Sequence, residues 1–162
     1  MSDSLTAAQR GWWFEDAIPG RTITHPGGRT VTADEHPRLA WLTDNASDVH
    51  GDMHRAAEGP FGQTLVLGAL TAAVVIGLAE PAVGRQLDAV RALPHGWSRI
   101  ALTATVVAGD TITARSLVDV ATPDEDGHGG LVGRVIEGRN QQGHVIVRVC
   151  DQRWAPSRKQ RG

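Results

Sequence analysis

The residue types best suited to chemistry gather in one short polar stretch, residues 44–50. It contains Asp44, Asn45, Ser47, Asp48 and His50. Histidine is the side chain whose ordinary pKa lies nearest neutrality, so His50 is suited to act as a general acid or base. A carboxamide or a hydroxyl can orient a water molecule beside it. The stretch therefore predicts proton transfer involving water, and the alternative is that His50 is a surface histidine in a polar loop.

The other histidines and the cysteine are weaker candidates. His54 follows His50 by four residues, on the same face of any helix, but no third ligand stands at a suitable spacing, so we predict no metal site. Cys150 lies in an alternating strand-like run, 145–150, and is interpreted as core filler rather than a nucleophile. The remaining histidines stand near turns or strand ends and are predicted to lie at the surface: His25, His36, His95, His128 and His144.

Three helical segments are expected in the first half. Thr32 followed by Glu35 fits a capping box, which predicts a helix over 33–43. A second, short helical piece is expected over 53–57. The apolar segment 64–79 is shorter than a membrane span needs, and its apolar residues point in every direction. We therefore interpret this segment as a core helix that is buried on all sides.

The second half alternates apolar and polar residues, as half-buried strands do. A helix followed by such strands predicts an α+β domain in which an antiparallel sheet wraps around the helix. A polar, Gly-rich loop is expected at 122–130. The predicted strands cover 21–24, 29–32, 98–106, 111–120, 131–139 and 145–154, with turns at 109–110 and 140–143.

Length and composition narrow the class of protein. A chain of 162 residues suits one domain, and a net charge of -2 argues against a nucleic-acid footprint. The single cysteine excludes an intrachain disulfide, and the N-terminus lacks the apolar core of a signal peptide, so a cytoplasmic protein is expected. The expected layout is a flexible N-terminus over 1–10, one domain over 11–156 and a basic, solvated tail over 157–162.

A family resemblance becomes visible around the polar stretch. MaoC-like dehydratases and (R)-specific enoyl-CoA hydratases carry Asp-x-Asn-Pro-x-His followed by a small residue six positions later. The segment 45–50 resembles this motif, and Ala56 occupies the small position. The resemblance covers roughly residues 12–155 and is closest to the mesaconyl-CoA hydratase branch, some members of which also have Asn in place of Asp. Further similar segments are 14–16, 28–32, 61–62, 96–97, 109–111 and 140–143.

The resemblance implies a single hot-dog fold and reversible hydration of a 2-enoyl thioester to a 3-hydroxyacyl thioester. His50 would be the base, Asn45, with Ser47, would position the water, and the backbone N–H of Gly68 would bind the enolate oxygen. The substrate would be carried on coenzyme A or an acyl-carrier protein and would enter between the subunits of a homodimer or higher homo-oligomer. No cofactor, nucleic acid or membrane is implied. The expected substrate-binding residues are Asp44, Asp48, Val66 and Leu67.

The departures from the motif leave rival hypotheses open. Asn45 can orient a water but cannot exchange a proton, and losing one general acid or base typically costs about 10²–10⁴ in rate. His50 could make both transfers, or Asp44 or Asp48 could supply the carboxylate. The protein could instead be a non-catalytic or partner-dependent subunit that binds acyl thioesters. A hot-dog thioesterase is a third hypothesis, disfavoured because the central apolar segment has no acidic residue.

Overall fold

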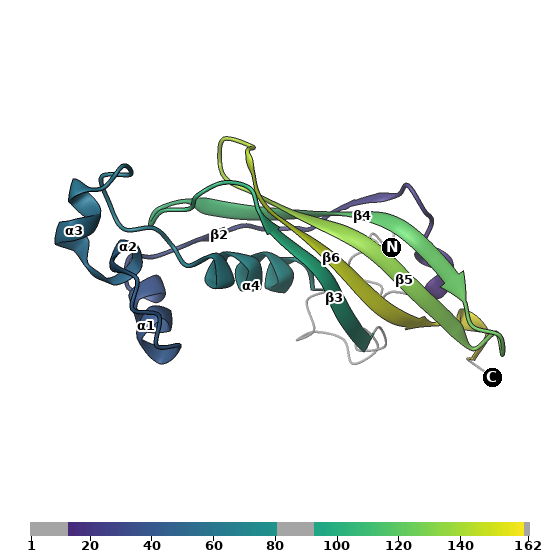
Figure 1. Ribbon diagram of the computed structural model, residues 1–162. Helices are drawn as coiled ribbons and strands as arrows, with labels where there is room; N and C mark the ends of the chain where they lie inside the picture. The colour runs from purple at the N-terminus through teal and green to yellow at the C-terminus, as the bar shows by residue number, and fades with distance from the viewer. Residues whose placement is uncertain (1–12, 81–92, 161–162) are drawn as a thin grey trace, which may run out of the picture.

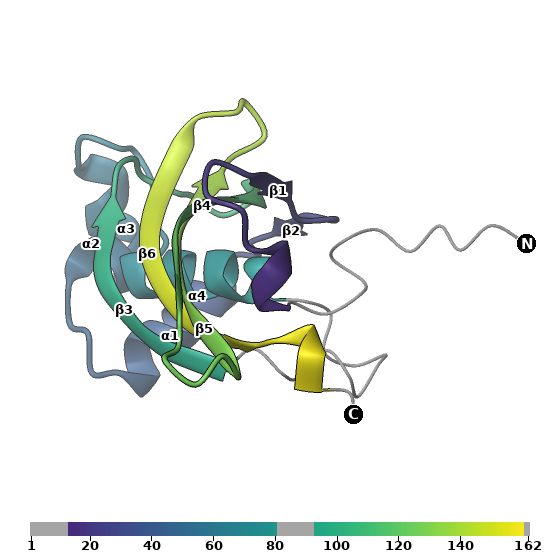
Figure 2. The ribbon, with the colours of Figure 1, turned by 90° about the vertical axis from the view of Figure 1, so that its right-hand side faces the viewer.

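The computed structural model describes residues 13–80 and 93–160. One curved antiparallel sheet wraps over a single long helix, α4 (Gly68–Ala79), as Figures 1 and 2 show. The strand order is β1-β4-β5-β6-β3, with β2 paired to β4. The predicted α+β architecture is therefore confirmed. The strands are β1 (Thr22–Thr24), β2 (Arg29–Thr30), β3 (Leu93–Leu102), β4 (Thr111–Pro123), β5 (Gly129–Arg139) and β6 (Val145–Pro156).

The main hydrophobic core lies between α4 and the concave face of the sheet. Val75 of α4 is fully buried, and it packs so close to β5 that a Cβ at Gly138 would overlap its side chain. The sheet contributes branched aliphatic side chains, which suit a pleated buried surface. Those with no exposed area include Ile112, Ile136, Ile146, Val147 and Val149.

Helix α4 is shorter and less enclosed than the sequence predicts. It begins at Gly68, because residues 65–67 lie outside the helix and the backbone N–H groups of Leu65 and Val66 bond to Val49 and Val106 instead. The prediction that it is buried on all sides is wrong for this single chain: Ala69, Ala73 and Gly77 form one exposed stripe at a spacing of four residues. Within the described residues, no helix is both long enough and apolar enough to cross a membrane.

Three short helices extend beyond the N-terminal end of α4 (Figure 1). In α1 (Glu35–Leu42), the Glu35 carboxylate accepts the Thr32 backbone N–H at 2.8 Å, which is one half of the predicted capping box. The polar stretch expected to be irregular contains α2 (Asp48–Gly51). In α3 (Met53–Glu58), the Asp52 carboxylate accepts two backbone N–H groups and caps the helix.

Two connecting regions differ from the predictions. Strands β4 and β5 continue to Pro123 and from Gly129, so the loop expected at 122–130 is shorter and consists of the hairpin tip 124–128. The expected solvated tail over 157–162 starts later than predicted, since Ser157 is buried and its hydroxyl donates to Glu15 at 2.6 Å, whereas Arg158 and Lys159 are exposed. A short 3-10 turn, Arg158–Gln160, follows. The expected flexible segment 1–10 lies outside the described residues.

A buried ionic network joins the C-terminal end of α4 to the sheet. Arg134 of β5 and Arg153 of β6 both donate to the Asp151 carboxylate, at 2.6 Å and 2.9 Å. Arg153 also pairs with Glu80, which follows α4, and Arg134 donates to the Ala79 carbonyl at 3.3 Å. Arg134 and Asp151 are each only 2% exposed. Charges this deep are stable only when paired.

Replacing Asp151 should therefore be costly. Asp151→Asn leaves two buried guanidinium groups with one carboxylate fewer, and we expect the free energy of unfolding to fall by about 3 kcal/mol or more. Urea unfolding followed by circular dichroism measures this. The matched control is Glu125→Gln in the exposed hairpin tip, expected to change stability by less than about 0.5 kcal/mol. Equal stability of the two variants would contradict the assigned role of the network.

His25 is buried beside this network, contrary to the prediction that it is a surface residue. Its Nε2 lies 2.7 Å from the Ser116 hydroxyl, and the residue is 6% exposed. Burial, and then the positive charges of Arg134 and Arg153, lower the pKa of His25 to about 4. The ring is therefore neutral in the folded chain at pH 7.

This lowered pKa predicts a pH dependence of stability. Between the ordinary pKa of 6.5 and about 4, the unfolded chain takes up a proton at His25 that the folded chain does not. Stability is therefore present above pH 6.5 and lost as the pH falls towards 4. We expect the His25 contribution to cost about 2 kcal/mol between pH 7 and pH 5. Urea titrations at both values should show that His25→Asn reduces the difference in stability by about this amount, and an unchanged difference would refute it.

Candidate active site

His50 is the third residue of α2 and is partly buried. Its ring Nδ1 lies 2.8 Å from the backbone carbonyl oxygen of Leu65. Because a carbonyl oxygen can only accept a hydrogen bond, Nδ1 must carry the hydrogen and donate it. In the neutral ring, Nε2 then has no hydrogen and is the basic nitrogen. The local structure thus fixes the tautomer that a general base at Nε2 requires.

The segment 65–67 sets the position of His50 relative to α4. The Leu65 N–H donates to the Val49 carbonyl at 2.9 Å, so Leu65 bonds to α2 through both of its backbone polar groups. The next residue, Val66, donates to the Val106 carbonyl at 2.8 Å. Two residues later α4 begins. Backbone hydrogen bonds therefore fix α2, which carries His50, beside the segment that leads into the central helix.

Gly68 is the first residue of α4. The opening N–H groups of a helix have no partner within it and carry partial positive charge, which favours a negative oxygen nearby. A Cβ at this position would overlap the side chain of Leu102 on β3. The absence of a side chain thus lets the end of β3 lie directly against the start of α4.

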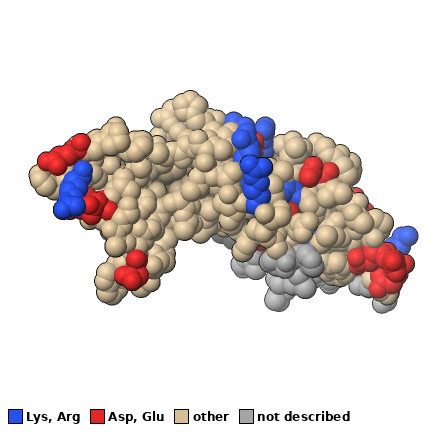
Figure 3. All heavy atoms as spheres, viewed as in Figure 1, with Lys and Arg blue, Asp and Glu red and all other residues tan. Residues whose placement is uncertain are grey.

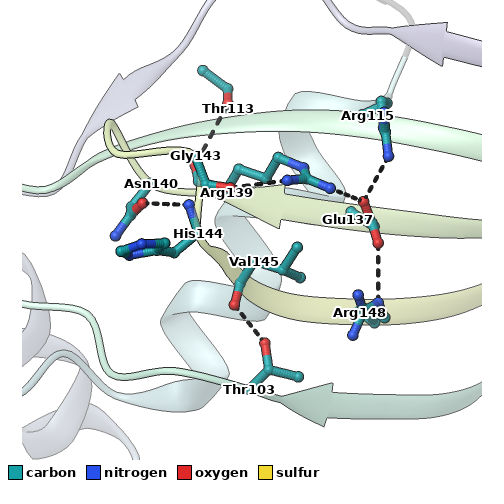
Figure 4. Close-up of polar contacts among 10 residues, drawn as sticks. All are labelled: Thr103, Thr113, Arg115, Glu137, Arg139, Asn140, Gly143, His144, Val145 and Arg148. Carbon is teal, nitrogen blue, oxygen red and sulfur yellow. Dashed lines mark hydrogen bonds and ion pairs between the residues drawn. The ribbon is translucent and has the colours of Figure 1, made fainter.

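A pocket of about 420 Å³ brings His50 and Gly68 together. Hydroxyl groups and apolar side chains form the rest of its wall. One of these hydroxyls, on Thr103, donates to the Val145 carbonyl at 2.7 Å (Figure 4). Within the described residues, the lining contains no carboxylate. The full lining is His50, Leu65, Val66, Gly68, Thr71, Leu102, Thr103, Ala104, Thr105 and Val106.

The other predicted catalytic residues lie outside this lining in the single chain. Asn45 and Ser47 are exposed, and the Asn45 side-chain oxygen accepts the Ser47 backbone N–H at 3.2 Å. Ser47 is the residue before α2 and makes no capping hydrogen bond through its side chain. Their roles in positioning water stay predictions.

The predicted substrate-binding residues are also divided. Val66 lines the pocket, whereas Leu67 is 3% exposed and belongs to the core. Asp44 is exposed and has a positive φ of 52°. Asp48 pairs with Arg55 at 2.6 Å, so its carboxylate is already held by a cation. In the described ranges 13–80 and 93–160, no cluster of His, Cys, Asp and Glu could hold a metal ion.

His36 is the residue near the site that the sequence analysis missed. It was predicted to lie at the surface, but it is 2% exposed in α1. Burial lowers its pKa, the nearby His50 charge lowers it further, and a hydrogen bond with the His50 backbone partly opposes this. The signal was present in the sequence, because His36 and the buried Ala40 stand four residues apart on one helix face. His144 and His128 are exposed, as predicted, and the side chain of His95 lies outside the described residues.

Comparison with curated proteins finds a distant relative of known activity. No family model matches the chain. The 3-hydroxyacyl-thioester dehydratase Z of Mycobacterium tuberculosis is 29% identical over 104 residues, as is the protein of the same name from Mycobacterium bovis. The match covers 62% of this chain and 66% of the relative, which is just under two thirds of its length.

Solved structures match over most of the chain. A MaoC-like dehydratase from Rhodospirillum rubrum has a TM-score of 0.77 at 20% identity, covering 91% of this chain and 99% of that one. The (R)-hydratase from A. caviae has a TM-score of 0.65 at 24% identity, with coverage of 86% and 97%. The ChsH1–ChsH2 complex from Mycobacterium tuberculosis contains a chain with a TM-score of 0.63 at 20% identity, with coverage of 85% and 98%.

This chain has the hot-dog fold. The similarity includes the central helix and the sheet that wraps it, and it confirms the fold that the family resemblance implied. At this level of identity it is the fold that the structures share. In this chain, a histidine whose tautomer is fixed and the N-terminus of the central helix border one pocket.

The hydrogen bond to Leu65 predicts the protonation pattern of His50. At a pH where the ring is neutral, ring ¹⁵N spectra should show hydrogen on Nδ1 and none on Nε2. The exposed His54 in α3 is the control, and it should show the Nε2-protonated form that usually dominates in free histidine. Hydrogen on Nε2 of neutral His50 would be incompatible with the described geometry.

Proposed function

We propose that this hot-dog chain is an acyl-thioester hydro-lyase, which reversibly adds water to a 2-enoyl thioester to give a 3-hydroxyacyl thioester. The observation that carries the proposal is the pocket shared by His50 and Gly68. The similarity to a 3-hydroxyacyl-thioester dehydratase and to the (R)-hydratase fold supports the reaction class.

In hydration, Nε2 of His50 takes a proton from water as the water oxygen bonds to the β-carbon. Negative charge then builds on the thioester oxygen as an enolate forms. The Gly68 N–H donates to that oxygen, which is the usual way a fixed backbone donor lowers such a barrier. The protonated His50 returns its proton to the α-carbon. Dehydration follows the same steps in reverse.

The water requires a second polar partner, and we propose Asn45, assisted by Ser47, for this role. In the single chain both residues lie outside the pocket lining, so the proposal requires the loop 44–47 to close on the bound substrate. Because an amide cannot take the proton, His50 would make both transfers. Val66 would contact the acyl group from the pocket wall. Asp44 and Asp48 would contact the substrate from the polar stretch 44–50.

We further propose that the active form is a homodimer. In the described part of the chain, β3 is an edge strand that pairs only with β6. Its Trp97, Ile100 and Leu102 are about half exposed, which is unusual for an unpaired edge. Near the site, Trp41 and Met53 are 82% and 78% exposed. Such apolar surface is typical of a protein interface.

The missing carboxylate in the pocket favours one alternative: a subunit that binds acyl thioesters but needs a partner chain for turnover. One structural relative is a subunit of the ChsH1–ChsH2 complex. This alternative predicts acyl-thioester binding without turnover by the chain alone. Two finer parts of the proposal are left to the turnover experiment. They are the carrier of the substrate, coenzyme A or a carrier protein, and the preference for mesaconyl-CoA that Asn45 suggests.

His50→Ala should reduce turnover by about 10²–10⁴, because it removes the one imidazole that the described residues contribute to the pocket lining. The assay follows loss of enoyl-thioester absorbance with short 2-enoyl-CoAs, including mesaconyl-CoA, and checks that no thiol is released. His54→Ala is the matched control and should keep full activity, since His54 is exposed on α3. Full activity of His50→Ala would refute the base. Binding without turnover by the unmodified chain would favour the partner-dependent subunit.

A further inference from the structure

The face of the sheet turned away from α4 carries a compact group of charges, which we call the outer-face cluster: Arg115, Glu137, Arg139 and Arg148 (Figure 4). Arg115, Glu137 and Arg148 stand directly opposite one another on β4, β5 and β6. Paired residues in neighbouring strands point to the same face, so these three form a row across the sheet. Arg139 lies two residues beyond Glu137 on the same face of β5.

All three arginines converge on the Glu137 carboxylate. The bonds measure 3.1 Å from Arg115, 2.7 Å from Arg139 and 3.0 Å from Arg148. Burial tends to raise the pKa of Glu137, but these hydrogen bonds outweigh it and hold the pKa below its ordinary value. The carboxylate is therefore ionised at neutral pH, and the cluster keeps two positive charges in excess.

The guanidinium groups have donors to spare. The side chains of Arg115 and Arg148 are each 48% exposed, whereas Glu137 is 16% exposed beneath them. A guanidinium carries five N–H groups, and in the described part of the chain Arg115 and Arg148 each use one, towards Glu137. Glu137 thus orients the two side chains without consuming their capacity to bind an anion. Figure 3 shows basic side chains gathered over the middle of the sheet.

A hollow of about 260 Å³ lies at this cluster. It combines the two guanidinium groups with a hydroxyl and with apolar side chains from the neighbouring row. Because the planar fork of arginine matches phosphate and carboxylate oxygens, this wall suits an anion with a small apolar part. The lining is Thr22, Arg115, Leu117, Val135, Glu137 and Arg148.

We propose that this hollow is a second ligand site, which binds a small organic dianion through Arg115 and Arg148 and packs its apolar part against Leu117 and Val135. The excess charge of the cluster matches a dianion, such as a phosphate monoester or a dicarboxylate. The site is separate from the His50 pocket. That pocket lies on the opposite face of the sheet, where its lining residue Leu102 packs against Gly68 of α4. It does not depend on the proposed hydro-lyase activity.

The test is isothermal titration calorimetry of the whole chain at low ionic strength with phenyl phosphate, inorganic phosphate and succinate. We expect saturable binding of one phenyl phosphate or one succinate per chain. Tighter binding of phenyl phosphate identifies a phosphate-ester site, and tighter binding of succinate identifies a dicarboxylate site. Inorganic phosphate should bind more weakly than phenyl phosphate, because it has no group to cover Leu117 and Val135.

Variants then localise the site. Arg115→Gln and Arg148→Gln should each weaken binding by about tenfold or more, since each removes a charged hydrogen-bond donor. Glu137→Gln should tighten it, because it removes the competing negative charge. Arg55→Gln is the matched control, because Arg55 pairs with Asp48 and does not line the hollow. This variant should bind the anions as the unmodified chain does. Circular dichroism checks that each variant folds.

Two results would overturn the proposal. One is the absence of binding for all three anions at millimolar concentration. The other is binding that Arg115→Gln and Arg148→Gln leave unchanged, which would place the anion elsewhere on the chain.

Discussion

Burial of α4 against the concave face of the sheet is the constraint on which the rest of the structure depends. Val75 of the helix and a row of branched aliphatic residues from the strands have no exposed area. Apolar surface removed from water contributes roughly 25 cal/mol per Å², so this contact is the main stabilising one in the chain. Where the sheet must approach the helix most closely, Gly138 provides the room.

The two ends of α4 illustrate how polar groups are accommodated beside such a core. At its C-terminal end, a closed set of ion pairs involving Arg134, Asp151 and Arg153 allows charge to be buried. At its N-terminal end the backbone N–H groups open into a pocket beside His50. The C-terminal end of α4 is packed with paired charges, whereas its N-terminal end borders an open pocket. The pocket that contains His50 therefore lies at the second of these ends.

The sequence predicted the elements with regular patterns better than the way they pack. Alternation located three of the four long strands and the second half of β3, which was predicted over 98–106 but ends at Leu102, and the capping pattern at Thr32 and Glu35 located α1. Residues 65–67 were assigned to the helix, because an apolar run has the same composition whether it is helical or extended; only the bonds to Val49 and Val106 decide. His25 and His36 were predicted to be exposed because each is a polar residue near a turn or a strand end. Their burial depends on strands and helices distant in sequence.

The candidate site shows the same division. The resemblance located His50 and Gly68, which the structure places in one pocket. It could not indicate that Asn45 bonds to Ser47, or that Asp48 is held by Arg55, since those contacts follow from the path of a short loop. The row of charges around Glu137 was also invisible, because strand register is set by pairing across the whole sheet and cannot be read from one strand.

The contact between His50 and Leu65 has a further consequence for how this protein can change over time. The acceptor is a main-chain carbonyl, so its position does not depend on which side chain residue 65 carries. Many substitutions at that position would leave the histidine tautomer as it is. The oxyanion donor proposed at Gly68 is also a main-chain N–H, but this position itself must stay glycine, because a Cβ there would overlap Leu102. A site built on backbone groups tolerates substitutions around it, provided that α4 and the segment 65–67 before it keep their backbone conformation.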